Sequence, residues 1–399
     1  MNQIAHPATV TSRPGLSLQE SALIAVIGFL TLVDLFATQA ILPGLATVYG
    51  VSPSKIGLAA NASTLGMAIS GLLMGVVSGS IERRRAIALS LFLLSVPTSL
   101  LAFAPNLVVF AALRVLQGLF MAAAFTLTLA HLAERCEVRT ANALAAYVTG
   151  VVASNLVGRL AAAFVASLIG AEQSFLFFAL LNLAGAALVT MTLHRNAPEP
   201  MARMGRFWVP WLEQLADPAL RRTFAIGFLI LFGFIGVFTY VGFVLMRPPN
   251  ALSMTALGLD FLVFLPSMIT TPLAGSVTRR AGPGPACSIS LALALIGLLL
   301  LLLPGLPMVI AGLTLVGIGT FFAQAVATGH VGRIAKGHKA AASGLYLSSY
   351  YCGGLAGAAV IGILFDFHGW TAAVGGVFAA LALAAILGWG LRQKEFMNE

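Results

Sequence analysis

Charged residues are scarce in this sequence of 399 residues: Asp, Glu, Lys and Arg make up 9% of it, whereas 59% is hydrophobic. A soluble domain carries about 25% charged residues. A water-soluble protein of this composition would expose far more apolar surface than solubility permits. The composition therefore excludes an ordinary soluble protein and predicts a chain that crosses a membrane many times.

Cysteine and the motifs of soluble enzymes are also nearly absent. The three cysteines, Cys136, Cys287 and Cys352, are far apart and lack the spacing of a metal site, so we interpret them as reduced packing residues. The sequence contains no Walker loop, no dinucleotide glycine fingerprint, no His-Glu-x-x-His and no paired-cysteine zinc pattern. We therefore expect no metal, no other cofactor and no enzymatic activity.

Long apolar runs follow one another along the chain at nearly regular spacing. The length of each run is close to the roughly 20 residues of a membrane-spanning helix. The runs are too long and too uniformly apolar for the strands of a membrane β-barrel. We therefore predict an all-α membrane protein with twelve transmembrane helices. The expected spans are 21–43, 56–79, 86–104, 107–130, 141–169, 173–193, 223–246, 255–278, 285–303, 307–330, 341–366 and 370–391.

Positive charge predicts how these helices are oriented. Most of the 22 Lys and Arg residues fall in segments on the same side as the N-terminus, such as Arg83–Arg85 and Arg221–Arg222. The opposite side carries only Lys55 and Arg247. Because Lys and Arg are enriched in cytoplasmic segments, we place both termini in the cytoplasm. The same distribution argues against a nucleic-acid partner, since the basic clusters flank membrane spans.

A polar stretch divides the predicted helices into two groups of six that repeat each other. Tyr147 and Gly158 in the fifth span match Tyr346 and Gly357 in the eleventh, at one constant offset. A parallel repeat of this kind predicts two pseudo-symmetric halves with a substrate site between them, near the membrane midplane. The predicted parts are a cytoplasmic tail, 1–20, a first bundle, 21–193, a cytoplasmic linker, 194–222, a second bundle, 223–391, and a cytoplasmic tail, 392–399.

Three charged residues fall deep inside apolar spans. Asp34, Arg114 and Arg159 lie at roughly 10–15 Å from the outer ends of their helices, at 1.5 Å per residue. Intramembrane charges face protein or a water-filled cavity and mark candidate functional sites. We predict that Asp34 carries a coupled proton, because burial favours the neutral carboxyl group and a nearby arginine favours the charged one. The alternative is a fixed Asp34–Arg ion pair that only holds helices together.

Polar and aromatic residues at plausible depths are candidates for substrate binding. Amides and hydroxyls orient a ligand, and aromatic rings supply contact area. A tyrosine in a membrane helix can instead be a packing residue, and Asp260, nearer the membrane surface, can instead reach water. The candidates are Thr38, Gln39, Gln117, Asn155, Tyr240, Asp260, Gln324, Tyr346 and Tyr350.

Three patterns in the sequence resemble the major facilitator superfamily. The fourth span carries Arg114-x-x-Gln117-Gly118, similar to a motif that the family associates with proton-coupled members. The fifth carries Gly150-x-x-x-Ser154-Asn155-x-x-Gly158-Arg159, which loosely resembles the family's antiporter motif, with Ser-Asn for Gly-Pro and Arg for the last Gly. Loops rich in glycine and arginine follow the second and eighth spans, and their gating candidates are Gly75, Glu82, Arg83, Arg84, Gly275, Arg279 and Arg280.

The segment 333–351 is similar to bacterial inner-membrane transporters of the YnfM type, in the drug:proton antiporter-like branch of the family. This resemblance implies a monomeric, multi-pass secondary transporter that works by alternating access in the bacterial inner membrane. Its partners would be the lipid bilayer, a small-molecule substrate and protons. We expect a proton-coupled exporter of small amphipathic or drug-like molecules. A specific carrier of a metabolite or organic anion is the alternative, since two intramembrane arginines outnumber Asp34.

Overall fold

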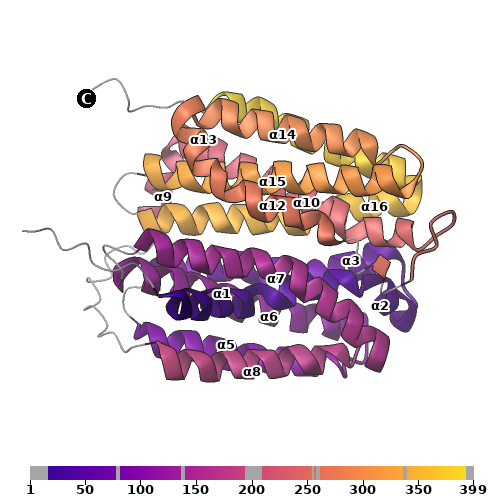
Figure 1. Ribbon diagram of the computed structural model, residues 1–399, viewed down its shortest axis with the longest axis horizontal. Coiled ribbons are helices and arrows are strands. Elements are labelled where there is room, and N and C mark those ends of the chain that lie inside the picture. Colours follow the sequence, from indigo (N-terminus) through magenta and orange to yellow (C-terminus); the bar gives the residue numbers. More distant parts are fainter. Residues whose placement is uncertain are drawn as a thin grey trace, which may run out of the picture.

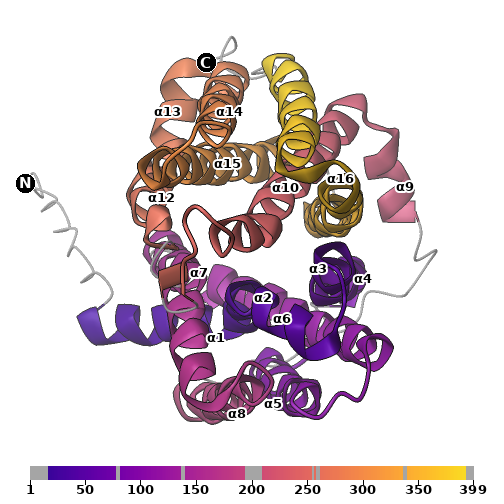
Figure 2. The ribbon, with the colours of Figure 1, turned by 90° about the vertical axis from the view of Figure 1, so that its right-hand side faces the viewer.

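The computed structural model contains helices and no strands in the residues that it describes, which are 17–77, 81–135, 140–193, 209–253, 256–257, 261–335 and 339–391. The long helices run side by side along the long axis of the molecule (Figure 1). Helices from the first half of the chain form one side of the bundle, and helices from the second half form the other (Figures 1 and 2). The predicted all-α membrane fold is confirmed.

The helices of the first half are called the N-terminal group. Its first helix begins earlier than predicted, because Ser17 and Glu20 form a capping box: the Ser17 hydroxyl accepts from the Glu20 amide (3.1 Å), and the Glu20 carboxylate accepts from the Ser17 amide (2.9 Å). The group consists of α1 (Leu18–Ala40), α2 (Leu42–Tyr49), α3 (Pro53–Asn61), α4 (Ser63–Val77), α5 (Arg83–Leu101), α6 (Leu107–Arg135), α7 (Thr140–Ile169) and α8 (Ser174–Thr192).

The helices of the second half are called the C-terminal group. Its second predicted span, 255–278, is the least regular, since the structure has four short helices, η2 to α13, between residues 261 and 281. The group consists of α9 (Val209–Ala216), α10 (Pro218–Leu245), η2 (Phe261–Phe264), α12 (Leu265–Thr270), η3 (Thr271–Leu273), α13 (Ala274–Ala281), α14 (Pro283–Leu300), α15 (Leu306–Ile334) and α16 (Lys339–Trp389).

Ten helices in the described ranges are long and apolar enough to cross a membrane. This number is two fewer than the twelve predicted spans. One of the two is missing because α16 covers both of the last two spans, with non-helical backbone at Gly369 (φ 77°, ψ −170°), a conformation that favours glycine. The other is the irregular segment 261–281. The exact count of twelve therefore stays a prediction.

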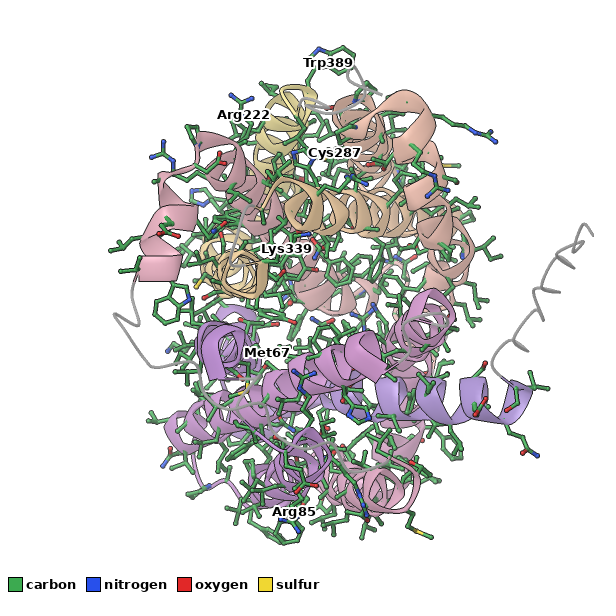
Figure 3. All side chains as sticks on the ribbon, turned by 90° about the vertical axis from the view of Figure 1, so that its left-hand side faces the viewer. Met67, Arg85, Arg222, Cys287, Lys339 and Trp389 are labelled. Atoms are coloured by element: carbon green, nitrogen blue, oxygen red, sulfur yellow. The ribbon has the colours of Figure 1, made fainter. Side chains whose placement is uncertain are left out.

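Large apolar side chains cover the outside of the bundle. Phe164 is 57% exposed, Ile269 is 74% exposed and Ile386 is 71% exposed. Apolar surface of this kind would favour aggregation in water but matches the hydrocarbon of a bilayer. Inside, side chains such as Met67 and Cys287 are fully buried, and Figure 3 shows them within the two groups while Arg85 lies at the outer edge.

The two groups contact each other along two seams. In one seam α3 and α4 pack against α16, and in the other α7 packs against η2 and α12 (Figure 2). Near the end where α2 and α3 lie, the Ser54 amide donates to the Asp366 carboxylate (3.3 Å). Asn61 Nδ2 donates to Thr239 Oγ1 (3.1 Å). Polar contacts therefore join the two groups at this end of the bundle.

Candidate proton site and arginine site

The second predicted span is broken, and α6 packs closely against the break. α3 ends at Asn61 and α4 begins at Ser63. Gly118 of α6 lies against this point: a Cβ on Gly118 would be 2.6 Å from the carbonyl carbon of Ser63, so a larger residue does not fit without a shift of the backbone. Arg114, one turn earlier in α6, therefore faces the break.

Arg114 supplies hydrogen bonds to the groups at this break. Its Nε donates to the carbonyl oxygen of Ala60 (2.7 Å), and its Nη2 donates to the Ser63 hydroxyl (3.0 Å). Carbonyl groups at the end of a helix lack partners within the helix, and the helix dipole favours a cation there. Arg114 is 1% exposed. This buried arginine therefore caps α3.

Gln117 connects Arg114 with Asp34. Its Oε1 accepts a hydrogen bond from Arg114 Nη1, and its Nε2 donates to Asp34 Oδ1 (3.0 Å). Arg114 itself approaches only the backbone carbonyl of Asp34 (3.5 Å). In this structure the Gln117 amide therefore bridges the two charged side chains. The choice between a coupled proton on Asp34 and an Asp34–Arg contact that only holds helices together is not made by this geometry.

Asp34 is a buried acid with one unused oxygen atom. It is 2% exposed. Its Oδ1 accepts from Gln117 and, at 3.4 Å, from the Thr98 hydroxyl. Its Oδ2 is buried and has no hydrogen-bond partner within the described ranges. Because buried polar atoms are normally hydrogen-bonded, Oδ2 is the atom of this side chain at which a proton can be held.

Two residues that the sequence analysis missed complete this site. The Thr98 hydroxyl of α5 accepts from Gln117 Nε2 (2.8 Å) and from Asn182 Nδ2 of α8 (3.3 Å). Asn182 is fully buried, and its Oδ1 has no donor among the described residues. An asparagine within an otherwise apolar span was a signal that could have identified it. We call Asp34, Thr98, Arg114, Gln117 and Asn182 the proton site.

Arg159 lies in a different environment, where the two groups meet. It is fully buried. Its guanidinium carbon lies near the centres of four phenyl rings, from α1, α10 and η2, at distances of 5.4 Å for Phe36, 6.0 Å for Phe234, 5.6 Å for Phe238 and 4.6 Å for Phe264. Rings at these distances attract a cation electrostatically. We call Arg159 and these four phenylalanines the arginine cage.

Two amide side chains of the N-terminal group accompany the arginine cage. Gln39 Oε1 accepts a hydrogen bond from Arg159 Nη2. Asn155 lies one turn before Arg159 in α7, on the same helix face. Gln39 Nε2 and both polar atoms of Asn155 are buried without a hydrogen-bond partner in the described part of the chain. The Gln39 and Asn155 side chains therefore have polar atoms that remain available for hydrogen bonds with a ligand near the guanidinium.

The predicted layer of one acid and two arginines therefore separates into two sites. The hydrogen bonds to the Asp34 carboxylate come from Gln117 and Thr98, whereas the Arg159 guanidinium bonds to Gln39. Depth along each helix predicted that these residues share a layer. It did not predict which face of each helix they occupy.

The three tyrosines predicted as substrate-binding residues make hydrogen bonds or ring contacts within the C-terminal group. Tyr346 donates to Gln324 Oε1 (2.7 Å), and its ring stacks with that of Tyr350 at 6.3 Å between centroids. The Tyr240 hydroxyl donates to the carbonyl oxygen of Ala358 (2.5 Å), which joins α10 to α16. These contacts are all within the C-terminal group and outside the arginine cage.

The last two substrate-binding candidates are Thr38 and Asp260. The Thr38 hydroxyl donates to the backbone carbonyl of Asp34 (3.1 Å), a bond within α1. Asp260 lies outside the described residues.

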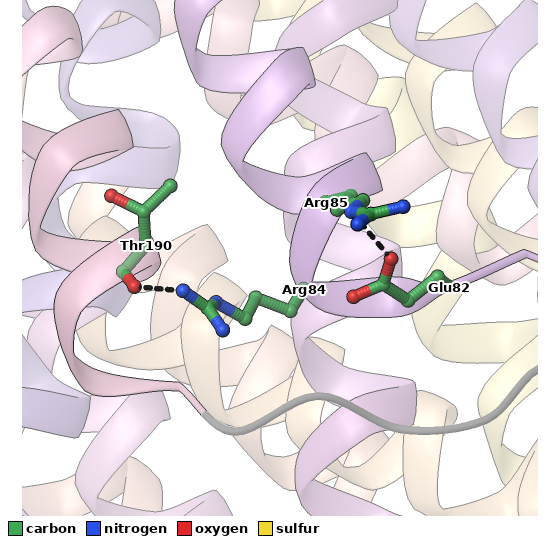
Figure 4. A network of polar contacts seen from close by, with 4 residues as sticks. All are labelled: Glu82, Arg84, Arg85 and Thr190. Atoms are coloured by element: carbon green, nitrogen blue, oxygen red, sulfur yellow. Dashed lines mark hydrogen bonds and ion pairs between the residues drawn. The ribbon is translucent and has the colours of Figure 1, made fainter.

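In the first loop rich in arginine, the gating candidate Glu82 forms an ion pair with an arginine. Glu82 Oε2 pairs with Arg85 Nε (2.8 Å), and Arg84 donates to the carbonyl oxygen of Thr190 in α8 (Figure 4). Arg83 is 7% exposed. Because Arg85 is 71% exposed, the ion pair contributes little to stability.

The remaining gating candidates lie in or beside helices. Gly75 is in the last turn of α4, just before residues 78–80, which are outside the described ranges. Gly275 is in the first turn of α13, and Arg279 and Arg280 are exposed in its last turn. Cations are favoured at this end of a helix by its dipole. These gating roles stay predictions.

The helices are apolar and form two groups, and charged side chains are buried inside one group and between the two. This arrangement defines a multi-pass membrane transporter. The chain belongs to the major facilitator superfamily, whose model matches residues 24–257 and 245–396. Its members are transporters rather than enzymes, in agreement with the prediction.

Known relatives and solved structures are similar over most of the chain. The inner membrane transport protein YnfM of Escherichia coli strain K12 is 29% identical over 92% of this chain and 88% of its own. The crystal structure of the human organic anion transporter MFSD10 (TETRAN) has a TM-score of 0.70 and 19% identity, and covers 93% of this chain and 100% of its own. A shorter match is the gentisate transporter of Corynebacterium glutamicum, which is 36% identical over 86 residues, covering 22% of this chain and 19% of its own.

Proposed function

We propose that the protein is a proton-coupled secondary transporter that exports small amphipathic molecules by alternating access. The single observation that supports coupling is the proton site: Asp34 is buried inside a membrane span, and its Oδ2 has no hydrogen-bond partner among the described residues. A buried ionisable residue within a membrane helix marks a proton or ion pathway more often than a packing position.

A chain of contacts links this acid to the boundary between the two groups. Asp34 bonds to Gln117, Gln117 to Arg114, and Arg114 to the end of α3 at Ala60. α3 in turn contacts the C-terminal group through Ser54, whose amide donates to Asp366. A movement of α3 during opening therefore changes the distance between the Arg114 charge and Asp34, which alters the affinity of the carboxylate for a proton.

In this proposal the two bundles, 21–193 and 223–391, rock against each other and are joined by the cytoplasmic linker 194–222. Both termini are cytoplasmic, and a single chain works in a bacterial inner membrane. Two observations support this arrangement: the positive charge on one side of the predicted spans, and the likeness to an inner membrane transport protein.

A specific carrier of an organic anion is the second candidate. The observation that favours it is Arg159, a cation buried where the two groups meet. The name of one relative, a gentisate transporter, also refers to an organic anion. Both candidates allow proton coupling, and they differ in the charge of the transported molecule.

Transport in proteoliposomes tests the coupling. Liposomes with an acidic interior are given three probes that share one aromatic ring: benzenesulfonate, benzyl alcohol and benzyltrimethylammonium. For a proton antiporter, we expect uphill uptake of at least one probe, and a dye inside the liposomes should report alkalinisation. Asp34→Asn should keep exchange of that probe at zero gradient but lose uphill uptake. An Asp34→Asn protein that still concentrates the probe would refute the coupling.

A further inference from the structure

We propose that the arginine cage, with Gln39 and Asn155, is a binding site for the carboxylate group of a small aromatic acid. This inference names the substrate class, and it rests on the proposed function of the protein as a transporter. The site lies between the two groups of helices, because Arg159 belongs to α7 and three of the four rings belong to α10 and η2.

The donors in this site suit a carboxylate. A guanidinium presents planar, parallel N–H groups that match the two oxygens of a carboxylate, and it remains charged at any physiological pH. Gln39 Nε2 and Asn155 Nδ2 add amide donors that are buried and unused within the described ranges. Buried donors normally have acceptors, and a carboxylate supplies acceptors for more than one of them.

The rings determine which carboxylates fit. Phe234 and Phe264 are 5.9 Å apart between centroids, and Phe238 and Phe264 are 4.7 Å apart. Rings at such distances attract the charge of the guanidinium, and its N–H groups donate hydrogen bonds within its plane. They also offer edges and faces to an aromatic ligand, whereas an inorganic anion gains nothing from them. An aromatic body attached to the carboxylate is therefore favoured.

The location explains how binding can be linked to the movement of the two groups. Phe264 and Phe238 are at most 1% exposed, so the guanidinium becomes accessible only when η2 and α10 move away from α7. A ligand held by Arg159 of one group and by rings of the other interacts differently with the open and closed arrangements. A difference of this kind is what allows a ligand to shift a conformational equilibrium.

Binding to the full-length protein in detergent tests this site without any proton gradient. The probes are benzoate and phenylacetate, with benzamide and phenylacetamide as neutral analogues of the same shape and acetate as a carboxylate without a ring. Calorimetry should detect the two aromatic acids and give at least about tenfold weaker binding for the amides and for acetate, since a hydrogen bond to a charged group is commonly worth a factor of this size.

Variants assign the binding to the cage. Arg159→Gln should abolish the preference for acid over amide, and Phe264→Leu should weaken both aromatic acids while leaving that preference. The matched control is Phe164→Leu, which changes a 57% exposed phenylalanine on the same helix as Arg159 and should bind as the wild type does. If Arg159→Gln does not fold, Asn155→Leu tests the same preference, which it should reduce.

Each outcome decides the proposal. It is overturned if no aromatic acid binds, if amides bind as tightly as acids, or if Arg159→Gln and Asn155→Leu keep the wild-type preference. None of these results affects proton coupling, because no gradient is present. Conversely, if the aromatic acids bind as expected but Asp34→Asn still drives uphill transport, the coupling role of Asp34 fails and the anion site stands.

Discussion

Replacement of Gly118 by alanine should destabilise the protein strongly, because this glycine sets the contact between α6 and the break after α3. A Cβ at this position would lie 2.6 Å from the carbonyl carbon of Ser63 and 2.9 Å from its Cα. Ordinary carbon–carbon contacts are about 3.5–4.0 Å, so the two backbones must separate by roughly 1 Å. The substitution therefore acts on the backbone and cannot be relieved by rotation of a side chain.

The separation also weakens the contacts made by Arg114. Its bonds to Ala60 (2.7 Å) and Ser63 (3.0 Å) would lengthen beyond hydrogen-bond range. Overpacking costs about 1–3 kcal/mol, and each hydrogen bond lost from a charged group costs about 1.5–3 kcal/mol. Because the helices can relax in part, we expect a total loss of about 3–6 kcal/mol in the free energy of unfolding.

Thermal unfolding in detergent measures this loss with a dye that becomes fluorescent on reaction with a thiol. Cys287 is fully buried and reports unfolding, while Cys136 and Cys352 are replaced by serine to remove background. Gly375→Ala is the matched control, since a Cβ there meets nothing within 4 Å and alanine favours a helix. If Gly118→Ala and Gly375→Ala unfold at the same temperature, the close contact of α6 with the break does not exist as described.

Three further predictions follow from the contacts and the charge pattern. Arg114→Lys should lose most coupled transport while the protein still inserts into the membrane, because one ammonium group cannot reach Ala60, Ser63 and Gln117 together. Normal proton-driven flux by the reconstituted Arg114→Lys protein would contradict this prediction. Asp366→Ala should remove the contact with Ser54 and speed maleimide labelling of a cysteine at Thr239, and an unchanged labelling rate would show that this contact does not hold the groups together. In intact cells an impermeant thiol reagent should label a cysteine at Lys55 and spare one at Arg280, and the reverse pattern would overturn the predicted orientation.

The sequence predicted the fold class because the apolar runs are long and cannot be soluble helices. It also predicted Asp34, Arg114 and Gln117 as candidate functional residues, since ionisable and amide groups are rare in such runs. The break between α3 and α4 was not predicted, because no proline or charged residue marks Ala62. Without that break, the role of Arg114 as a helix cap was not visible.

The partners of Arg159 also could not be predicted from the sequence. The rings around it come from α1, α10 and η2, which are far apart along the chain. Periodicity does not tell which phenylalanine faces another helix, since these spans are apolar on nearly every side. Depth placed Arg159 in a layer with Asp34, but the rotation of α7 directs its guanidinium to Gln39 and the rings.

Proton exchange on substrate binding tests the coupling role of Asp34 most directly. Benzoate, phenylacetate or benzenesulfonate, whichever binds, is mixed with the full-length protein in weakly buffered detergent solution, and a pH dye follows the bulk solution. If proton and substrate binding are linked through Asp34, the wild-type protein should release or take up protons in proportion to the probe bound. Asp34→Asn should bind the probe with no proton exchange. Equal proton exchange by both proteins would contradict the assignment of the coupled proton to Asp34.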